Sequence, residues 1–457
     1  MIHMLDEHKS NVWNIIKWFF LATFIGIIVG VLDAVFLKTL EGAIAFRNHI
    51  PYFYLGLPLV LYATTMVARR AAPKDRDYST DSVINKINTY RPISFFSITK
   101  GFVLSIVTMV TGGSAGKEAP CADVGAGISS ILSRWFRMSI EDQRKMMICG
   151  VSAGFAGVFG VPISGALFGL EVLWVGHIFY EVMFPALVAG ITAFQVTTYL
   201  GVDYIYHPLH FVPVFSEQFF LKVIIAGMFF GIVSILFIEM TKFVKVLFRY
   251  IALRTRLFWA CFIGGLVLIA MGYFTSPLYL GLGMPGIDSV LSGQAPESPF
   301  GFLYKIITTS VTFAAGGVGG IVTPIFFVGA QAGAMLSDFL KVDSATLAAI
   351  GLVAVLAGSA NTPLSASIMA IELFGAAVAP YATVACVISF LITGQQSIYP
   401  SQRVSFDKGS TDGPSVPVQY GPRTEKKIPT KKGMFKKAAK QMFKHLIPNP
   451  KGFDDEK

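Results

Sequence analysis

The sequence predicts an all-α membrane protein that crosses the bilayer several times. Of its 457 residues, 54% are hydrophobic and only 14% are charged, whereas a water-soluble domain has about a quarter of its residues charged. The mean hydropathy is +0.62, and long apolar segments recur along the chain. Because lipid offers no partner to backbone polar groups, helices are the expected form of these segments.

The apolar segments differ in length. Several approach or reach the length that spans a hydrocarbon core of ~30 Å, whereas others are too short to cross it as straight helices. Tilted or broken helices are therefore expected. The segments lie at 12–36, 52–68, 97–111, 180–200, 219–240, 257–274, 346–358 and 381–394.

The chain divides into a membrane body and two polar ends. Residues 1–11 form a short lead, 12–205 and 215–402 two membrane halves, and 403–457 a tail rich in lysine and proline. The first apolar run is followed by no small-residue cleavage site, so we expect its helix to be retained. Much of the net charge of +10 lies in the tail, which favours the cytoplasmic side of the cell membrane for both termini. Residues 433–446 form either a basic amphipathic helix on anionic lipid or part of a solvated tail.

The two halves contain an internal repeat. Residues 150–172 match 351–373 at seven positions without a gap, at an offset of 201, and residues 112–126 match 316–330 at seven positions, at an offset of 204. Two blocks in the same order at nearly the same offset indicate duplication. Duplicated halves are typical of transporters and channels, whose sites lie between the halves and are formed by interrupted helices. Both blocks are rich in glycine and proline, as an interrupted helix requires.

Residues 112–120, GGSAGKEAP, form the sharpest motif of the sequence. A glycine-rich loop followed by Pro120 and an apolar helix presents unpaired N–H groups at a helix N-terminus, which binds anions. Glu118 would sit there as a built-in anion that leaves when it is protonated or displaced, which makes it a candidate gate. The alternative is a carboxylate that only favours its own helix dipole, or one that pairs with Lys117. Within a membrane body, an ionisable residue is a functional candidate by default.

These motifs resemble those of the CLC family of chloride channels and chloride/proton antiporters. The family's gating motif, Gly-(Arg/Lys)-Glu-Gly-Pro, reads GKEAP at 116–120, with Ala119 in place of the usual glycine. The later Gly-x-Phe-x-Pro motif reads GIVTP at 320–324, with Val322 in place of phenylalanine. Segments 161–172 and 362–372 resemble the family's two proline-to-glutamate helices, and Tyr399 matches its pore tyrosine. The resemblance covers roughly residues 12–402.

The resemblance implies an anion pathway and a set of anion-binding residues. It implies two inverted halves in each subunit and a homodimer with one pore per subunit, with chloride or a similar small anion as the permeant ion. Ser79 is the best candidate for the coordinating hydroxyl, with Tyr78 and Thr80 as alternatives, because the family's first anion motif is poorly kept at 77–82. The other residues expected to bind the anion are Gly116, Lys117, Gly320, Ile321, Val322 and Tyr399.

Val172 bears on the mechanism. Proton-coupled members of the family often carry a second glutamate directly after the helix glutamate, and here Glu171 is followed by Val172, which cannot relay a proton. This favours a passive channel. A chloride/proton antiporter is the alternative, because Glu118 is retained and some exchangers lack the inner glutamate. Glu171 and Glu372 occupy equivalent repeat positions and are expected to be structural, paired with backbone donors, although Glu171 is also a candidate for proton movement.

Other functions are weakly supported by the sequence. A fluoride-selective relative remains an alternative because of the eroded first motif. A membrane enzyme would need a catalytic constellation, and a cation channel would need rings of acidic residues, neither of which the sequence shows. The four cysteines have no metal or disulfide spacing and are expected to be small core residues. No cofactor, metal or nucleic-acid partner is predicted.

Overall fold

The computed structural model describes residues 2–71, 79–204, 206–209, 216–405 and 408. Tyr78, one of the three candidates for the coordinating hydroxyl, lies outside the described residues. The same is true of the segment 433–446 and of nearly all of the basic tail. Among the described residues, sixteen α-helices, three short 3-10 helices and a two-residue parallel strand pair are present, so the all-α prediction is confirmed.

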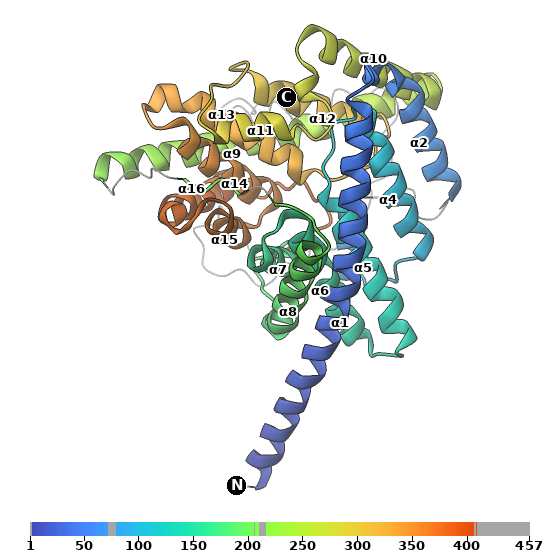
Figure 1. The fold of residues 1–457 in the computed structure, drawn as a ribbon, viewed down its shortest axis with the longest axis vertical. Coiled ribbons are helices and arrows are strands. Elements are labelled where there is room, and N and C mark those ends of the chain that lie inside the picture. The colour runs from blue at the N-terminus through green and yellow to red at the C-terminus, as the bar shows by residue number, and fades with distance from the viewer. Residues whose placement is uncertain (1, 72–78, 205, 210–215, 406–407, 409–457) are drawn as a thin grey trace, which may run out of the picture.

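The helices follow the order of the apolar segments and cover most of the membrane body (Figure 1). The 3-10 helices are η1 (Phe53–Gly56), η2 (Pro277–Tyr279) and η3 (Ala376–Val378), and the strands are β1 (Trp174–Val175) and β2 (Arg403–Val404). The α-helices are α1 (Ile2–Arg47), α2 (Leu57–Ala71), α3 (Thr80–Asn88), α4 (Phe95–Val110), α5 (Glu118–Trp135), α6 (Ile140–Phe159), α7 (Pro162–Glu171), α8 (Tyr180–Tyr199), α9 (Glu217–Arg254), α10 (Leu257–Phe274), α11 (Met284–Leu291), α12 (Gly301–Ala314), α13 (Val322–Leu340), α14 (Ser344–Ala360), α15 (Pro363–Phe374) and α16 (Ala379–Thr393).

Five stretches of helix in the described part of the chain are long and apolar enough to cross a membrane: Asn11–Arg47, Tyr180–Tyr199, Glu217–Arg254, Leu257–Phe274 and Ala376–Thr393. The helices α4, α14 and α15 are apolar but shorter. The protein is thus a multi-pass membrane protein with helices of unequal length, as expected. All four cysteines are free and buried, which agrees with their predicted place in the core.

The expected helix breaks occur at equivalent positions of the two halves. α6 ends before Gly160, which has a φ of 71°, and α14 ends before Asn361, which has a φ of 58°. Both residues cap their helix in the left-handed conformation, which glycine adopts freely and asparagine tolerates. Proline then opens the next helix, as Pro162 in α7 and Pro363 in α15, because its missing N–H would be unpaired there anyway.

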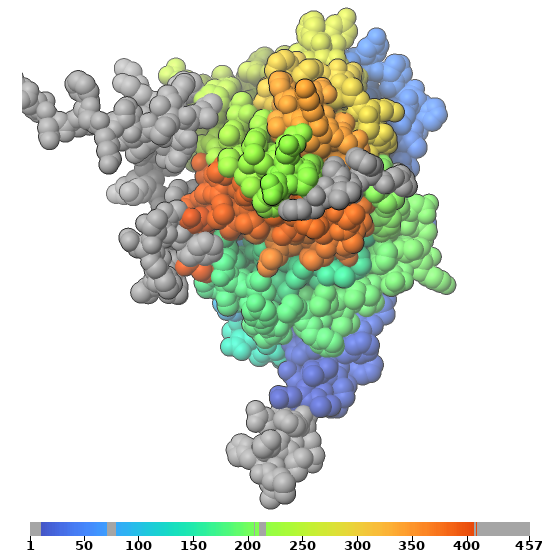
Figure 2. All heavy atoms as spheres, turned by 90° about the vertical axis from the view of Figure 1, so that its left-hand side faces the viewer, coloured from blue at the N-terminus to red at the C-terminus, as the bar shows by residue number. Residues whose placement is uncertain are grey.

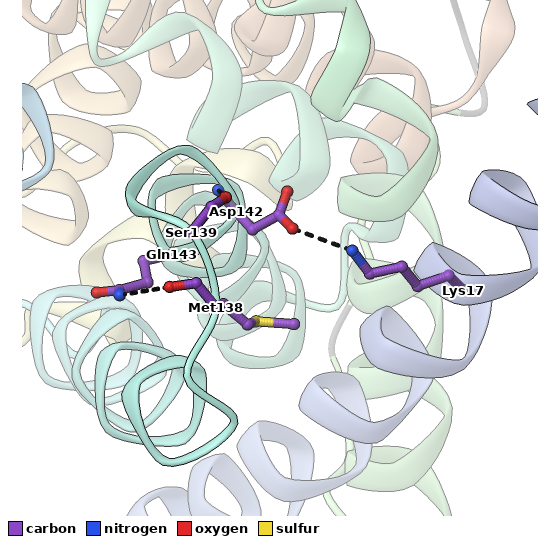
Figure 3. A network of polar contacts seen from close by, with 5 residues as sticks. All are labelled: Lys17, Met138, Ser139, Asp142 and Gln143. Carbon is purple, nitrogen blue, oxygen red and sulfur yellow. Dashed lines mark hydrogen bonds and ion pairs between the residues drawn. The ribbon is translucent and has the colours of Figure 1, made fainter.

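The long helix α1 is tied to the start of α6. Lys17 Nζ lies 3.0 Å from Asp142 Oδ2 (Figure 3), and Ser139 caps α6 by accepting the Asp142 N–H at 3.1 Å. Gln143 donates to the Met138 carbonyl at 2.9 Å. α5 ends immediately before this turn, so α5 runs from Glu118 towards the face on which α1 begins.

The two halves pack directly against each other. In Figure 2 the red and orange residues of the second half lie on the teal and green residues of the first. The helices α7 and α15 contact each other across this interface. Their starts are bonded by Ser164 Oγ, which donates to the Ser365 carbonyl at 2.9 Å, and by Ser365 Oγ, which donates to the Ser164 carbonyl at 2.9 Å. The contacts are equivalent and support duplication at the offset of 201.

Candidate functional site

The site begins where the two glycine-rich loops meet. Gly116 and Gly320 form an isolated antiparallel bridge, in which each N–H donates to the other's carbonyl at 2.7 and 2.8 Å. The two residues are related by the repeat offset of 204. The bridge therefore joins equivalent points of the two halves and brings together the N-termini of α5 and α13.

Glu118, the first residue of α5, is bound by the start of α13. Its Oε1 accepts the Val322 N–H at 2.6 Å, and its Oε2 accepts the Thr323 N–H at 3.3 Å and the Thr323 hydroxyl at 2.9 Å. Only 3% of Glu118 is exposed. The carboxylate thus lies where unpaired N–H groups and the helix dipole favour negative charge. It reaches the helix of the other half, and both of its oxygens are held there instead of by Lys117.

The Glu118 carboxylate is bound at the helix start that the 320–324 motif indicates. The sequence pointed to N–H groups around Ile321 and Val322, and the carboxylate is bound by Val322 and Thr323. Ile321 is the N-cap residue of α13. Thr323 was not singled out from the sequence, although it lies within the 320–324 motif that located the helix start. Lys117 is the N-cap residue of α5, and the charges of Glu41, Glu118 and Asp288 act on it.

Tyr399 and Ser79 are brought to this region by a link between α3 and the segment that follows α16. Asp81 accepts the Ser401 N–H at 2.7 Å and the Ser401 hydroxyl at 2.8 Å. Asp81 lies two residues after Ser79, and Ser401 lies two residues after Tyr399. The Tyr399 side chain is buried, with 4% exposed, and the charge of Glu118 acts on it. Ser79 caps α3 by accepting the Ser82 N–H at 3.4 Å.

Val172 is fully buried, and its carbonyl is bound by Gln402 Nε2 at 2.8 Å. The same Gln402 nitrogen donates to the Ala360 carbonyl at 2.7 Å. β1 and β2 continue this connection, since Trp174 pairs with Arg403. The position after Glu171 is therefore a packed joint between the halves, and its side chain carries no group that binds a proton.

Glu171 and Glu372 cap each other's helices across the interface. Glu171, at the end of α7, accepts the N–H groups of Leu364 and Ser365 at 3.1 and 2.9 Å. Glu372 accepts those of Ile163 and Ser164 at 2.9 and 2.8 Å. The expectation that both carboxylates are paired with backbone donors is confirmed. Each satisfies two N–H groups that the start of a helix leaves without an intrahelical partner.

The fold and this arrangement define a class of protein: a duplicated all-α membrane protein with broken helices whose N-termini meet between the halves. Residues 59–394 match the family model described as "Voltage gated chloride channel". The chain belongs to this family, whose members transport anions across membranes as channels or transporters and are not enzymes.

Individual relatives carry different names. The chain is 37% identical over 406 residues to a "Chloride/fluoride channel protein" of Pseudomonas syringae pv. tomato, which covers 86% of this chain and 88% of that protein. It is 24% identical over 385 residues to an "H(+)/Cl(-) exchange transporter" of Klebsiella pneumoniae, covering 78% of this chain and 80% of that protein.

Two solved structures share the fold. A CLC-type fluoride/proton antiporter superposes with a TM-score of 0.79 at 28% identity, covering 85% of this chain and 98% of that one. A slow cyanobacterial Cl⁻/H⁺ antiporter superposes with a TM-score of 0.73 at 20% identity, covering 84% of this chain and 96% of that one. At this identity, the second likeness concerns the fold alone.

Proposed function

We propose that this protein conducts chloride or a closely similar small anion through a pathway that Glu118 gates. The observation that carries the proposal is the binding of the Glu118 carboxylate by the Val322 and Thr323 N–H groups and the Thr323 hydroxyl. These donors are neutral, so they bind an anion without the fixed cation that would trap it. A carboxylate at this position competes with the permeant ion for the same donors.

Protonation of Glu118 opens the pathway. A protonated carboxyl group loses most of its attraction to the positive end of the α13 dipole and to the N–H donors. An anion then takes its place, bound by Val322 and Thr323, with Gly116, Lys117, Gly320 and Ile321 lining the approach. Ser79 and Tyr399 supply hydroxyl groups to the same pathway. Anion flux should therefore rise as the pH falls.

Protons could take part in two ways, which correspond to a passive channel and to anion/proton exchange. Val172 favours a passive channel, because a buried valine cannot pass a proton towards Glu118. The second candidate is anion/proton exchange, with chloride or fluoride as the anion. It is favoured by the 28% identity to a fluoride/proton antiporter and by the retained Glu118. Exchange requires a carboxyl group other than the residue at position 172 to carry the proton from the second side.

Glu118→Gln tests the gate. The full chain is reconstituted in liposomes with an anion gradient, and chloride and fluoride efflux are measured from pH 4.5 to 7.5. Glutamine mimics the protonated state, so efflux should be as high at pH 7.5 as at pH 4.5, whereas wild-type efflux should fall severalfold over the same range. The matched control is Glu217→Gln, which alters an exposed carboxylate at the start of α9. A Glu118→Gln protein that retains the wild-type pH dependence would refute the gate.

The assembly and orientation belong to the same proposal. We expect a homodimer in the cell membrane with one pathway per subunit and with both termini on the cytoplasmic side. The two membrane halves have the boundaries 12–205 and 215–402. Mass measurement of the protein in lipid nanodiscs tests the dimer, and a monomeric mass would contradict it. Labelling of cysteines introduced at positions 5 and 450 from outside the cell tests the orientation.

A further inference from the structure

Helix α5 contains a second buried carboxyl group, Asp123, five residues after Glu118. Its exposed fraction is 1%. Neither carboxyl oxygen has a hydrogen-bond partner of good geometry among the described residues. A buried ionised carboxylate without donors is strongly disfavoured, because it has lost its hydration and gained nothing in return. Such a residue within a membrane body therefore indicates a function that needs a proton or water to reach it.

Asp123 lies among the elements that are proposed to form the anion pathway. The Thr80 hydroxyl, at the start of α3, lies beside its carboxyl group. The charge of Asp123 acts on Tyr399, as does that of Glu118. The link between Asp81 and Ser401 holds the start of α3 against the Tyr399 segment. Asp123 thus borders the pathway next to its candidate hydroxyl donors.

The direction of α5 places Asp123 between Glu118 and the face of the molecule on which α1 begins. α5 runs from Glu118 towards the face where α1 begins, because the turn after α5 leads into the start of α6, where Asp142 pairs with Lys17 (Figure 3). Five residues of helix correspond to an advance of about 7.5 Å. A proton that arrives from the face of the α1 start therefore meets Asp123 before it meets Glu118.

Charged groups of opposite sign act on the buried Asp123 carboxyl group. Lys86, on α3, favours the carboxylate form, whereas the negative charge of Glu118 favours the protonated form. The third titratable neighbour is Tyr399. An ionised Glu118, bound to α13, thus promotes the uptake of a proton by Asp123, and a neutral Glu118 promotes its release. This is the sign of coupling that a proton donor to Glu118 requires.

We propose that Asp123 is a proton-binding site that delivers protons to Glu118 from the face of the membrane on which α1 begins. The proposal rests on the proposed function of Glu118 as the gate and on anion/proton exchange, the second candidate for the role of protons. A hydronium ion at that face gives its proton to the Asp123 carboxylate, which becomes a neutral carboxyl group, and a water molecule is left. The proton then passes through water in the pathway to the Glu118 carboxylate. Asp123 returns to its carboxylate form as Glu118 becomes neutral and leaves the donors of α13, so the net change is the transfer of one proton from the aqueous phase to Glu118.

The variant Asp123→Asn tests whether proton uptake can be lost while anion efflux continues. The full-length protein is reconstituted in liposomes with an outward anion gradient, and anion efflux and proton uptake are recorded together. Wild-type protein should take up protons as the anion leaves, and Asp123→Asn should lower the ratio of protons to anions at least tenfold. Asparagine has the shape of aspartate and cannot bind a proton at neutral pH. Asp123→Ser gives the same readout if the asparagine variant does not yield monodisperse protein.

Asp33→Asn is the matched control. Asp33, on α1, is also 1% exposed, its oxygens have no hydrogen-bond partner of good geometry among the residues that the structure describes, and it lies against Cys121 of helix α5. Its replacement should leave the ratio of protons to anions unchanged. The inference is wrong if Asp123→Asn retains the wild-type ratio, if Asp33→Asn lowers it equally, or if the wild-type protein moves no protons. In all three cases, the pH response of Glu118→Gln still decides separately whether Glu118 is the gate.

Discussion

Gly116 and Gly320 make room for the Glu118 carboxylate at the meeting of the two loops. A Cβ atom on Gly320 would overlap Glu118 Oε1, and one on Gly116 would overlap Oε2. The glycines also let the two backbones approach closely enough to form their bridge. At the scale of the residue, the Glu118 side chain can therefore adopt this conformation only because positions 116 and 320 carry no Cβ atom. Its hydrogen bonds to α13 then hold it there.

Gly320→Ala should displace the carboxylate from α13. The added methyl group takes the volume that the Glu118 oxygens fill, while the flexible glutamate side chain can move away. Anion efflux from liposomes at pH 7.5 should rise severalfold over wild type and lose most of its pH dependence. Gly42→Ala is the control, since a Cβ atom there meets nothing within 4 Å. Unchanged pH dependence in Gly320→Ala would show that the carboxylate stays in place despite the substitution.

At the scale of the element, the start of α7 and the start of α15 are each stabilised by a glutamate from the last turn of the other helix. Each helix opens with proline, and each receives a carboxylate from the other half at its first free N–H groups. The exchange explains why Glu171 and Glu372 recur at equivalent repeat positions. It also gives Glu171 a structural task that is complete without any proton transfer.

Glu171→Ala and Glu372→Ala should destabilise the protein to similar extents. Each substitution leaves two N–H groups at a helix start without an acceptor, at about 1–3 kcal/mol for each group that remains buried and unsatisfied. The midpoint of thermal unfolding in detergent, followed by tryptophan fluorescence, should fall by several degrees. Glu217→Ala, at the exposed start of α9, should change it little. A Glu171→Ala protein with wild-type stability and altered proton movement would assign this residue to the proton route instead.

At the scale of the whole molecule, the halves are joined by pairs of contacts in which equivalent residues of the repeat play the same part. The Thr312 hydroxyl accepts the Ser114 N–H at 3.0 Å, and the Thr108 hydroxyl accepts the Val318 N–H at 3.1 Å. All four residues are buried, and each pair spans the two halves. Together with the bridge between the glycine loops, they hold the site between the halves in one geometry.

Thr108→Val and Thr312→Val should weaken this joint equally. Valine keeps the shape of threonine but removes the acceptor, so one buried N–H is left unpaired in each variant, at a cost of about 1–3 kcal/mol. We expect similar decreases in the thermal midpoint in detergent. Thr99→Val, on an exposed part of α4, serves as the control. Strongly unequal decreases would mean that the two halves do not share the joint symmetrically.

The sequence alone determined the fold class and the duplication, and it singled out Glu118 as the candidate gate residue. Hydropathy and the glycine and proline motifs are local properties of the chain, so they indicated interrupted helices within the repeat blocks 150–172 and 351–373 and marked the two loops that precede α5 and α13. Glu118 stood out because a carboxylate at a glycine-rich helix start is rare in an apolar body. The repeat offset of 204 also made Val322 the equivalent of Glu118 in the second half.

Only the tertiary structure decided which groups each carboxylate faces. Glu118, Glu171 and Glu372 each bind N–H groups about 200 residues away in the chain, and a carboxylate at a helix end has the same sequence signature whichever helix it caps. The sequence did not separate Asp123, whose buried carboxyl oxygens have no hydrogen-bond partner of good geometry in the described part of the chain, from an ordinary residue of a helix turn. Burial and hydrogen bonding depend on how distant segments pack, and for that reason the role of Thr323 and the isolation of Asp123 emerged only from the folded chain.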